Sequence, residues 1–166
     1  MSTPEPRCFD CAGRKQRLCA PDGQFDAAYL ARSYLDMITL RETDDAAADA
    51  LFWAFNCLSD MLIDDPERAF HVTLLMINTL ETPLQASVVA SGPMEDLIAD
   101  TGAEFIDRIE VLARRSPRFR YVLSGVWPQG QEGRPIWNRV ESARAPGPDM
   151  DSSATLPAAD GASFRD

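Results

Sequence analysis

The fold class follows from residues 65–83, which read DPERAFHVTLLMINTLETP. Asp65 suits the N-cap of a helix, and Pro66 suits its first position, where the missing N–H has no intrahelical partner anyway. Apolar side chains then recur at helical spacing until Thr82-Pro83 opens another helix. The apolar positions on one line are Phe70, Leu74 and Ile77. The stretch therefore predicts a helix over Pro66–Glu81.

The same signals for helix starts and helix ends recur along the chain. Gly92-Pro93 and Ser116-Pro117 are further proline starts, and Gly102 and Gly125 stand where a helix can stop. No segment has the length and alternation of a strand. The sequence predicts an all-α fold, a compact bundle of six to eight short helices. The predicted spans are 26–41, 44 or 45 to 62, 66–81, 83–91, 93–101, 103–115, 117–124 and 134–144.

The second predicted helix has the clearest apolar pattern. Leu51, Phe55, Leu58 and Leu62 fall on one stripe, and Phe52-Trp53 widens it. We expect this helix to be central in the fold.

Two of the predicted helices repeat one another weakly. Phe70, Leu74, Ile77 and Pro83 align with Phe105, Ile109, Leu112 and Pro117 at an offset of 34 or 35 residues. Such an offset is typical of helical hairpins that stack into solenoids. A compact bundle and a solenoid-like stack are both open at this point.

The chain divides into three parts by composition. Residues 1–23 form an irregular arm that holds three of the four cysteines, residues 24–144 form the helical domain, and residues 145–166 are rich in Pro, Gly, Ser and Ala. The last part lacks bulky apolar periodicity and is predicted to be a disordered tail. Residues 127–135 fit either an ordered loop or a mobile one.

Charge is distributed unevenly over a chain whose net charge is −10. Residues 22–107 hold 17 acidic residues and three arginines, a net charge of −14, whereas residues 108–144 hold eight arginines and three glutamates, a net charge of +5. Solvated helix faces explain this pattern, and so does an acidic surface that attracts a basic partner. An acidic chain of this kind is not expected to bind nucleic acid.

The chain carries no run of apolar residues long enough for a membrane span and no apolar segment near Met1. We therefore expect a cytoplasmic protein that does not associate with a membrane.

One cysteine pattern has the spacing of a metal site. Cys8 and Cys11 form a C-x2-C pair, and Cys19 follows as a third thiolate for zinc. The fourth ligand would be Cys57, His71 or a carboxylate, although Cys57 fits a core position better. Reduced thiols in a flexible arm are the competing interpretation, because no second C-x2-C pair is present.

Two charged clusters are candidates for an interaction surface. One is basic, and the other is an acidic cluster at a predicted helix start, where the helix dipole attracts carboxylates in any case. Their residues are Arg114, Arg115, Arg118 and Arg120 in the first, and Glu95 and Asp96, with Asp100 nearby, in the second. The sequence holds no phosphate-binding glycine loop and no nucleophile elbow.

Several stretches resemble those of a small bacterial family that is catalogued only as a domain of unknown function. They are residues 50–55, 64–70, 92–97, 105–110, 117–120 and 123–127, including Gly-Pro-Met-Glu-Asp-Leu and Gly-Val-Trp. The resemblance extends over residues 26–140 and implies a compact helical bacterial protein. It implies no activity.

These observations favour a non-enzymatic protein-binding module of immunity-type or regulatory character. Its acidic helical surface would face a basic protein partner. Two alternatives are a metal-dependent enzyme that uses the acidic cluster and a small zinc-binding interaction protein. The oligomeric state does not follow from the sequence.

Overall fold

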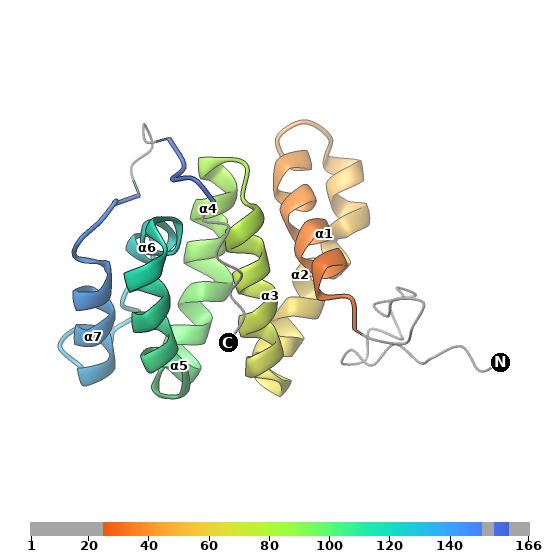
Figure 1. Ribbon diagram of the computed structural model, residues 1–166. Coiled ribbons are helices and arrows are strands. Elements are labelled where there is room, and N and C mark those ends of the chain that lie inside the picture. The colour runs from red at the N-terminus through yellow and green to blue at the C-terminus, as the bar shows by residue number, and fades with distance from the viewer. Residues whose placement is uncertain (1–24, 151–154, 160–166) are drawn as a thin grey trace. The chain divides into compact units, whose positions relative to one another are not determined.

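The computed structural model describes residues 25–150 and 155–159. They are helical and contain no β-strand, which confirms the all-α prediction (Figure 1). The chain separates into two compact units, with the boundary between Met76 and Ile77, whereas the sequence predicts one helical domain over 24–144. The elements are α1 (Ala27–Leu40), α2 (Asp45–Asp64), α3 (Pro66–Thr79), α4 (Pro83–Val89), the π-helical turn η2 (Ala90–Met94), α5 (Glu95–Arg115), α6 (Pro117–Ser124) and α7 (Pro135–Arg144).

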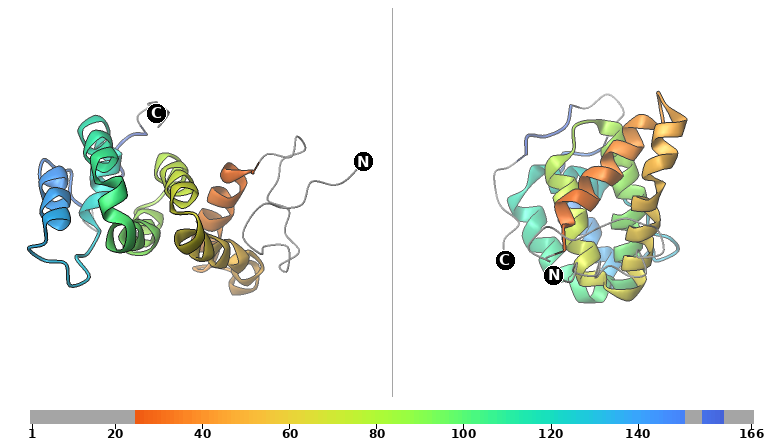
Figure 2. Two further views of the ribbon diagram at one scale, coloured as in Figure 1. Left: turned by 90° about the horizontal axis from the view of Figure 1, so that it is seen from below. Right: turned by 90° about the vertical axis from the view of Figure 1, so that its right-hand side faces the viewer.

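The first unit is built on a hairpin of α1 and α2, which lie side by side in all views (Figures 1 and 2). Aspartates cap three of its helices, as the Oδ1 atoms of Asp26, Asp44 and Asp65 accept backbone N–H groups three residues on. Trp53 stacks on Tyr29 with ring centroids 5.5 Å apart. The acids at these helix starts therefore have a structural role.

The buried face of α2 differs from the predicted stripe. Leu58 is buried as predicted, but Phe55 and Phe52 are partly open to solvent and stack on one another with centroids 5.2 Å apart. The side chains buried on α2 are Ala48, Trp53, Ala54, Cys57, Leu58 and Met61. The buried line is displaced by one position from the predicted stripe, since Ala54, Cys57 and Met61 each lie one residue before a member of it.

By length and composition alone, α2 is the one described helix that is apolar enough to cross a membrane. Core helices of soluble proteins meet the same criterion, and α2 packs against α1 with Ala54, Cys57 and Met61 fully buried.

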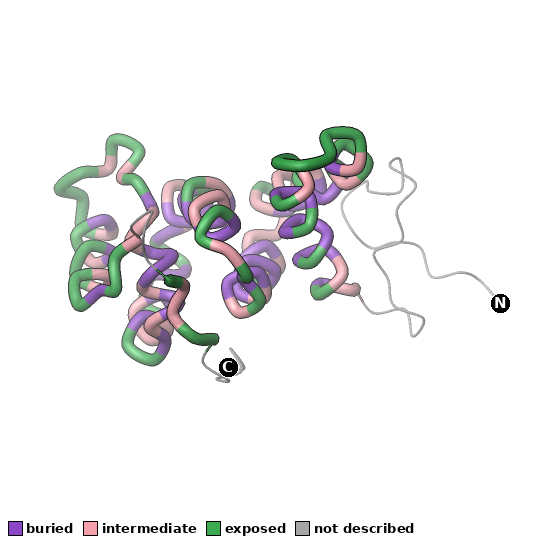
Figure 3. Tube along the Cα trace, turned by 90° about the horizontal axis from the view of Figure 1, so that it is seen from above, coloured by how far each residue is buried: buried purple, intermediate pink, exposed green. Residues whose placement is uncertain are grey.

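The second unit runs from the end of α3 through α7. Its helices α4, α6 and α7 begin at Pro83, Pro117 and Pro135, as the sequence predicts. The hydroxyls of Thr82 and Ser116 accept the N–H groups of Gln85 and Phe119 and cap α4 and α6. Burial follows one side of each helix, while the connections between helices are mostly exposed (Figure 3).

Two predicted helix boundaries coincide with kinks where the backbone is not helical. Gly92 has φ −114° and ψ −106° inside η2, which joins α4 to α5. Thr101 has φ −129° and ψ 16° inside α5, so the helical segments predicted over 93–101 and 103–115 are separated by a kink at the predicted place. A Cβ at the following Gly102 would lie 3.0 Å from Ile136 Cγ2 of α7. The role of this glycine is close helix packing.

The described residues beyond α7 are attached to α6. Arg120 donates to the Gly147 carbonyl, Ser124 Oγ accepts the Met150 N–H at 2.6 Å, and Arg118 Nε donates to the Pro157 carbonyl at 2.8 Å. Residues 145–150, which we call the strap, thus have defined hydrogen bonds in a segment where composition predicts disorder.

Candidate functional site

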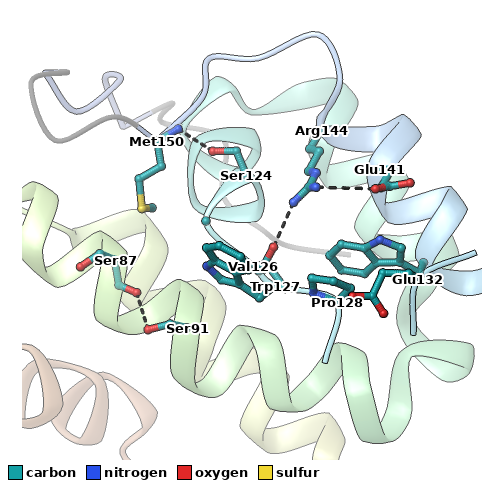
Figure 4. A pocket seen from close by; sticks show the side chains of 12 residues that line it. Ser87, Ser91, Ser124, Val126, Trp127, Pro128, Glu132, Glu141, Arg144 and Met150 are labelled. Atoms are coloured by element: carbon teal, nitrogen blue, oxygen red, sulfur yellow. Dashed lines mark hydrogen bonds and ion pairs between the residues drawn. The ribbon is translucent and has the colours of Figure 1, made fainter. Parts of the chain in front are cut away.

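A groove of about 560 Å³ lies beside Trp127 in the second unit (Figure 4). Side chains from α4, α7, the loop after α6 and the strap surround it. The lining residues are Ser87, Ser91, Ser124, Gly125, Val126, Trp127, Pro128, Glu132, Trp137, Glu141, Arg144 and Met150. We call it the Trp127 groove. It combines two indoles and a thioether with exposed carboxylates.

Trp127 is 72% exposed, although the peptide group that joins it to Val126 is held at both its carbonyl and its N–H. Its N–H donates to Glu95 Oε2 at 2.9 Å, and the carbonyl of the preceding Val126 accepts from Arg144 Nη1 at 3.0 Å. These two hydrogen bonds fix the position of the backbone from which the indole extends. The protein thus presents a large apolar ring to solvent from an ordered position.

Glu95 organises the loop that follows Trp127. It is only 5% exposed, and its other carboxylate oxygen accepts from the Gln129 side-chain amide. Gln131 Nε2 donates to the Ala99 carbonyl of α5 at 2.9 Å. Gln129 and Gly130 have positive φ values of 50° and 77°, which turn the chain back toward α7. Of the two interpretations of residues 127–135, the structure has the ordered loop.

Arg144 connects three parts of the groove. Besides its bond to the Val126 carbonyl, its guanidinium lies 5.0 Å from the ring centroid of the buried Trp137, and its Nη2 is 3.9 Å from Glu141 Oε1. Figure 4 shows Arg144 reaching from α7 toward Val126. The guanidinium is therefore committed to the groove's framework, whereas Glu132 and Glu141 are open to solvent.

A second ionic contact joins α7 to α5. Arg139 donates to both oxygens of Glu110 at 2.8 Å and to Asp107 Oδ1 at 2.6 Å. The hydrogen bonds from Arg139 lower the pKa of Glu110, although desolvation opposes them, and the same carboxylates raise the pKa of Arg139. Because α7 supplies Trp137, Glu141 and Arg144, this contact helps to place one wall of the groove.

The basic cluster predicted from sequence separates into two kinds of residue. Arg118 is buried and donates to the carbonyls of Leu80 at 3.0 Å and Asn78 at 3.3 Å, and Arg120 donates to those of Ala113 and Gly147. These two arginines satisfy backbone carbonyls. Arg114 and Arg115 are exposed at the end of α5.

The acidic cluster also divides. Glu95 is buried and supports the loop, whereas Asp96 and Asp100 are exposed on α5. Burial of part of the Asp96 side chain raises its pKa, and the charges of Asp100 and Glu95 raise it further. The π-helical turn η2 leads into α5, so these acids come after a turn of helix. The attraction of carboxylates by the dipole at a helix start therefore explains their position only in part.

The predicted zinc ligands Cys8, Cys11 and Cys19 lie outside the described residues. Cys57 is fully buried in α2, as expected for a core position, and His71 is exposed on α3. Within residues 25–150 and 155–159, no three His, Cys, Asp or Glu side chains are grouped so that they could hold a metal ion.

Trp127 is the principal residue that the sequence analysis did not single out. The sequence does contain an indication of its exposure, because Trp127 stands next to Pro128 in a predicted connection between helices. An apolar ring at such a position does not lie on the buried face of a helix. Glu95 was noted for its charge, but its bond to the Trp127 N–H joins residues 32 positions apart, and no local pattern indicates that pairing.

The family comparison covers the later part of the first unit and most of the second. The model of a family of unknown function, DUF6869, matches residues 41–147, in agreement with the resemblance noted from the motifs. No curated protein and no solved structure matches the chain.

Proposed function

The chain belongs to this family of unknown function, and we propose that it is a non-enzymatic protein-binding module whose Trp127 groove takes a basic segment of a protein partner. The observation that carries the proposal is Trp127, exposed at 72% and attached to a peptide group that Glu95 and Arg144 hold. An indole is among the side chains that contribute most to protein–protein binding energy. Tryptophan also has only two side-chain torsions to order on binding.

The charges around the groove favour a basic occupant. Glu132 and Glu141 are exposed in its lining, and the one arginine there, Arg144, pairs with Glu141, so the lining carries a net charge of −1. A lysine or arginine of the partner can contact a carboxylate and the face of Trp127, since indole attracts cations most strongly among aromatic rings. The net charge of −10 on the whole chain adds long-range attraction.

The enzymatic alternative has weaker support. A metal site built on Glu95, Asp96 and Asp100 would need the Glu95 carboxylate, but both of its oxygens accept hydrogen bonds from the loop. The alternative of a zinc-binding interaction protein depends on cysteines outside the described residues. We therefore retain binding as the proposed function.

The test is a selection of short random peptides on the full chain, followed by binding measurements on Trp127→Ala. We expect the enriched peptides to be rich in lysine and arginine. By calorimetry, Trp127→Ala should weaken their binding by about tenfold or more, which corresponds to ~1.4 kcal/mol. The double variant Glu132→Gln with Glu141→Gln should weaken binding and reduce its dependence on salt.

Leu84→Ala is the matched control, since Leu84 is also a large exposed apolar residue of the second unit and does not line the groove. It should bind the selected peptides as the unaltered chain does. The proposal fails if the enriched peptides bind Trp127→Ala equally well, or if they are neutral or acidic.

A further inference from the structure

Met150 of the strap occupies a niche at one end of the Trp127 groove. A Cβ at Gly125 would lie 2.7 Å from Met150 Sδ, 2.9 Å from its Cε and 3.0 Å from Ala90 Cβ. The thioether therefore fills space that exists only because residue 125 has no side chain. Figure 4 shows the Met150 side chain pointing into the groove from the strap.

The backbone at Gly125 does not explain the glycine. Its φ of −85° and ψ of −1° are open to any residue, and α6 ends there without a left-handed turn. The space for Met150 and the closeness of Ala90 are the features that a side chain would remove. The glycine thus creates a narrow slot that suits an unbranched apolar chain such as that of methionine.

A backbone acceptor stands beside the niche. Ser124 Oγ donates its proton to the Tyr121 carbonyl at 2.7 Å, which leaves its lone pairs to accept the Met150 N–H at 2.6 Å. A peptide-binding subsite provides two such features, an acceptor for a backbone N–H and a slot for the side chain of the same residue.

The strap is a poor electrostatic match for the groove that it enters. Residues 145–150 contain no basic side chain, and Asp149 is exposed next to Met150, whereas Glu132 and Glu141 line the groove. The strap contains no helix or strand, and it is held on α6 by the hydrogen bonds of Arg120 to the Gly147 carbonyl and of the Met150 N–H to Ser124 Oγ. A basic segment with the same apolar side chain would gain the attraction that the strap lacks.

We propose that the niche formed by Gly125, Ala90 and Ser124 is a subsite for an unbranched apolar residue of the partner segment, and that Met150 holds this subsite until a basic segment displaces it. The inference rests on the proposed function and adds the class of side chain that is recognised next to the basic residue. It also makes the strap a competitor for the groove.

The probe is a capped peptide of residues 145–150 that carries Asp149→Lys. Titrated into the full chain, it should bind Met150→Ala about tenfold more tightly than the unaltered chain, because the internal competitor is gone. Adding Gly125→Ala to Met150→Ala should abolish the gain, since the new Cβ fills the slot. A probe with valine in place of its methionine should bind Met150→Ala more weakly.

Ser124→Ala in the Met150→Ala background gives a second test that leaves the packing at Gly125 unchanged. It should lower probe affinity, and thermal melting shows whether each variant is folded. The subsite is disproved if Met150→Ala binds the probe no better than the unaltered chain, or if both Gly125→Ala and Ser124→Ala leave binding intact. If selected peptides still require Trp127 in that case, the proposed function stands without the subsite.

Discussion

The buried Glu95 carboxylate positions Trp127 by binding the backbone of that residue. Its two oxygens accept the Trp127 N–H and the Gln129 amide, so the exposed indole depends on a group at the start of α5. Sequence reasoning identified Glu95 only as one acid among several at a helix start. The partner of a buried carboxylate is decided by tertiary contact, which single-sequence patterns do not contain.

Glu95→Ala should destabilise the protein by about 1–3 kcal/mol, because it removes two partly buried hydrogen bonds to a charged acceptor. Glu95→Gln should cost less, since a reoriented Gln129 amide can restore one bond. Urea denaturation measures both, and Glu104→Ala, an exposed carboxylate of the same helix, serves as the control with little effect. Equal stability of Glu95→Ala and Glu104→Ala would contradict this role.

Asp96 provides a prediction on pH. Its pKa is raised by desolvation first and by Asp100 and Glu95 second, so the ionised form is disfavoured in the folded state. Stability therefore falls as pH rises from the ordinary aspartate pKa of about 3.9 through the raised value, and the cost is complete above it. Asp96→Asn removes this cost.

Thermal melting of Asp96→Asn should show a gain of at most about 0.5 kcal/mol at neutral pH, as is typical for an exposed position. The gain should vanish below about pH 3, where the aspartate is protonated in both states. A variant less stable than the unaltered chain at neutral pH would show that the carboxylate is favourable where it stands.

At the scale of elements, prolines predicted most of the helix starts. Pro66, Pro83 and Pro117 open α3, α4 and α6 because the constraint of proline acts locally on its own backbone, whereas Pro93 lies inside η2, directly after the kink at Gly92. Gly102 follows the kink at Thr101, and Ile136 of α7 also approaches it closely. The close approach of Ile136 depends on tertiary structure, so the sequence contains no signal for it.

Gly102→Ala should therefore fail to give the gain of about 1 kcal/mol that alanine usually brings to a helix interior. The new methyl group would lie 3.0 Å from Ile136 Cγ2 and should make the variant less stable than the unaltered chain. In an Ile136→Ala background the same change should stabilise. A double-mutant cycle by urea denaturation measures this coupling, and simple additivity would contradict the packing explanation.

At the scale of the whole molecule, the net charge of the chain predicts how fast charged partners associate, which no local sequence pattern does. A chain with a net charge of −10 should attract basic peptides over a distance. We expect the association rate of a selected basic peptide to fall steeply as salt is raised, with a smaller change in its dissociation rate. Stopped-flow or surface-binding kinetics test this, and an association rate independent of salt would show that steering is absent.

The burial of the three tryptophans has an optical consequence. Trp53 and Trp137 are buried in their respective units, at 8% and 2% exposure, and Trp127 alone is open to solvent. A neutral quencher such as acrylamide should therefore reach one indole and spare two, which makes the quenchable part of the native emission a report on the groove. Occupancy of the groove can thus be followed in the unlabelled chain, with Trp127→Ala as the reference that lacks the exposed indole.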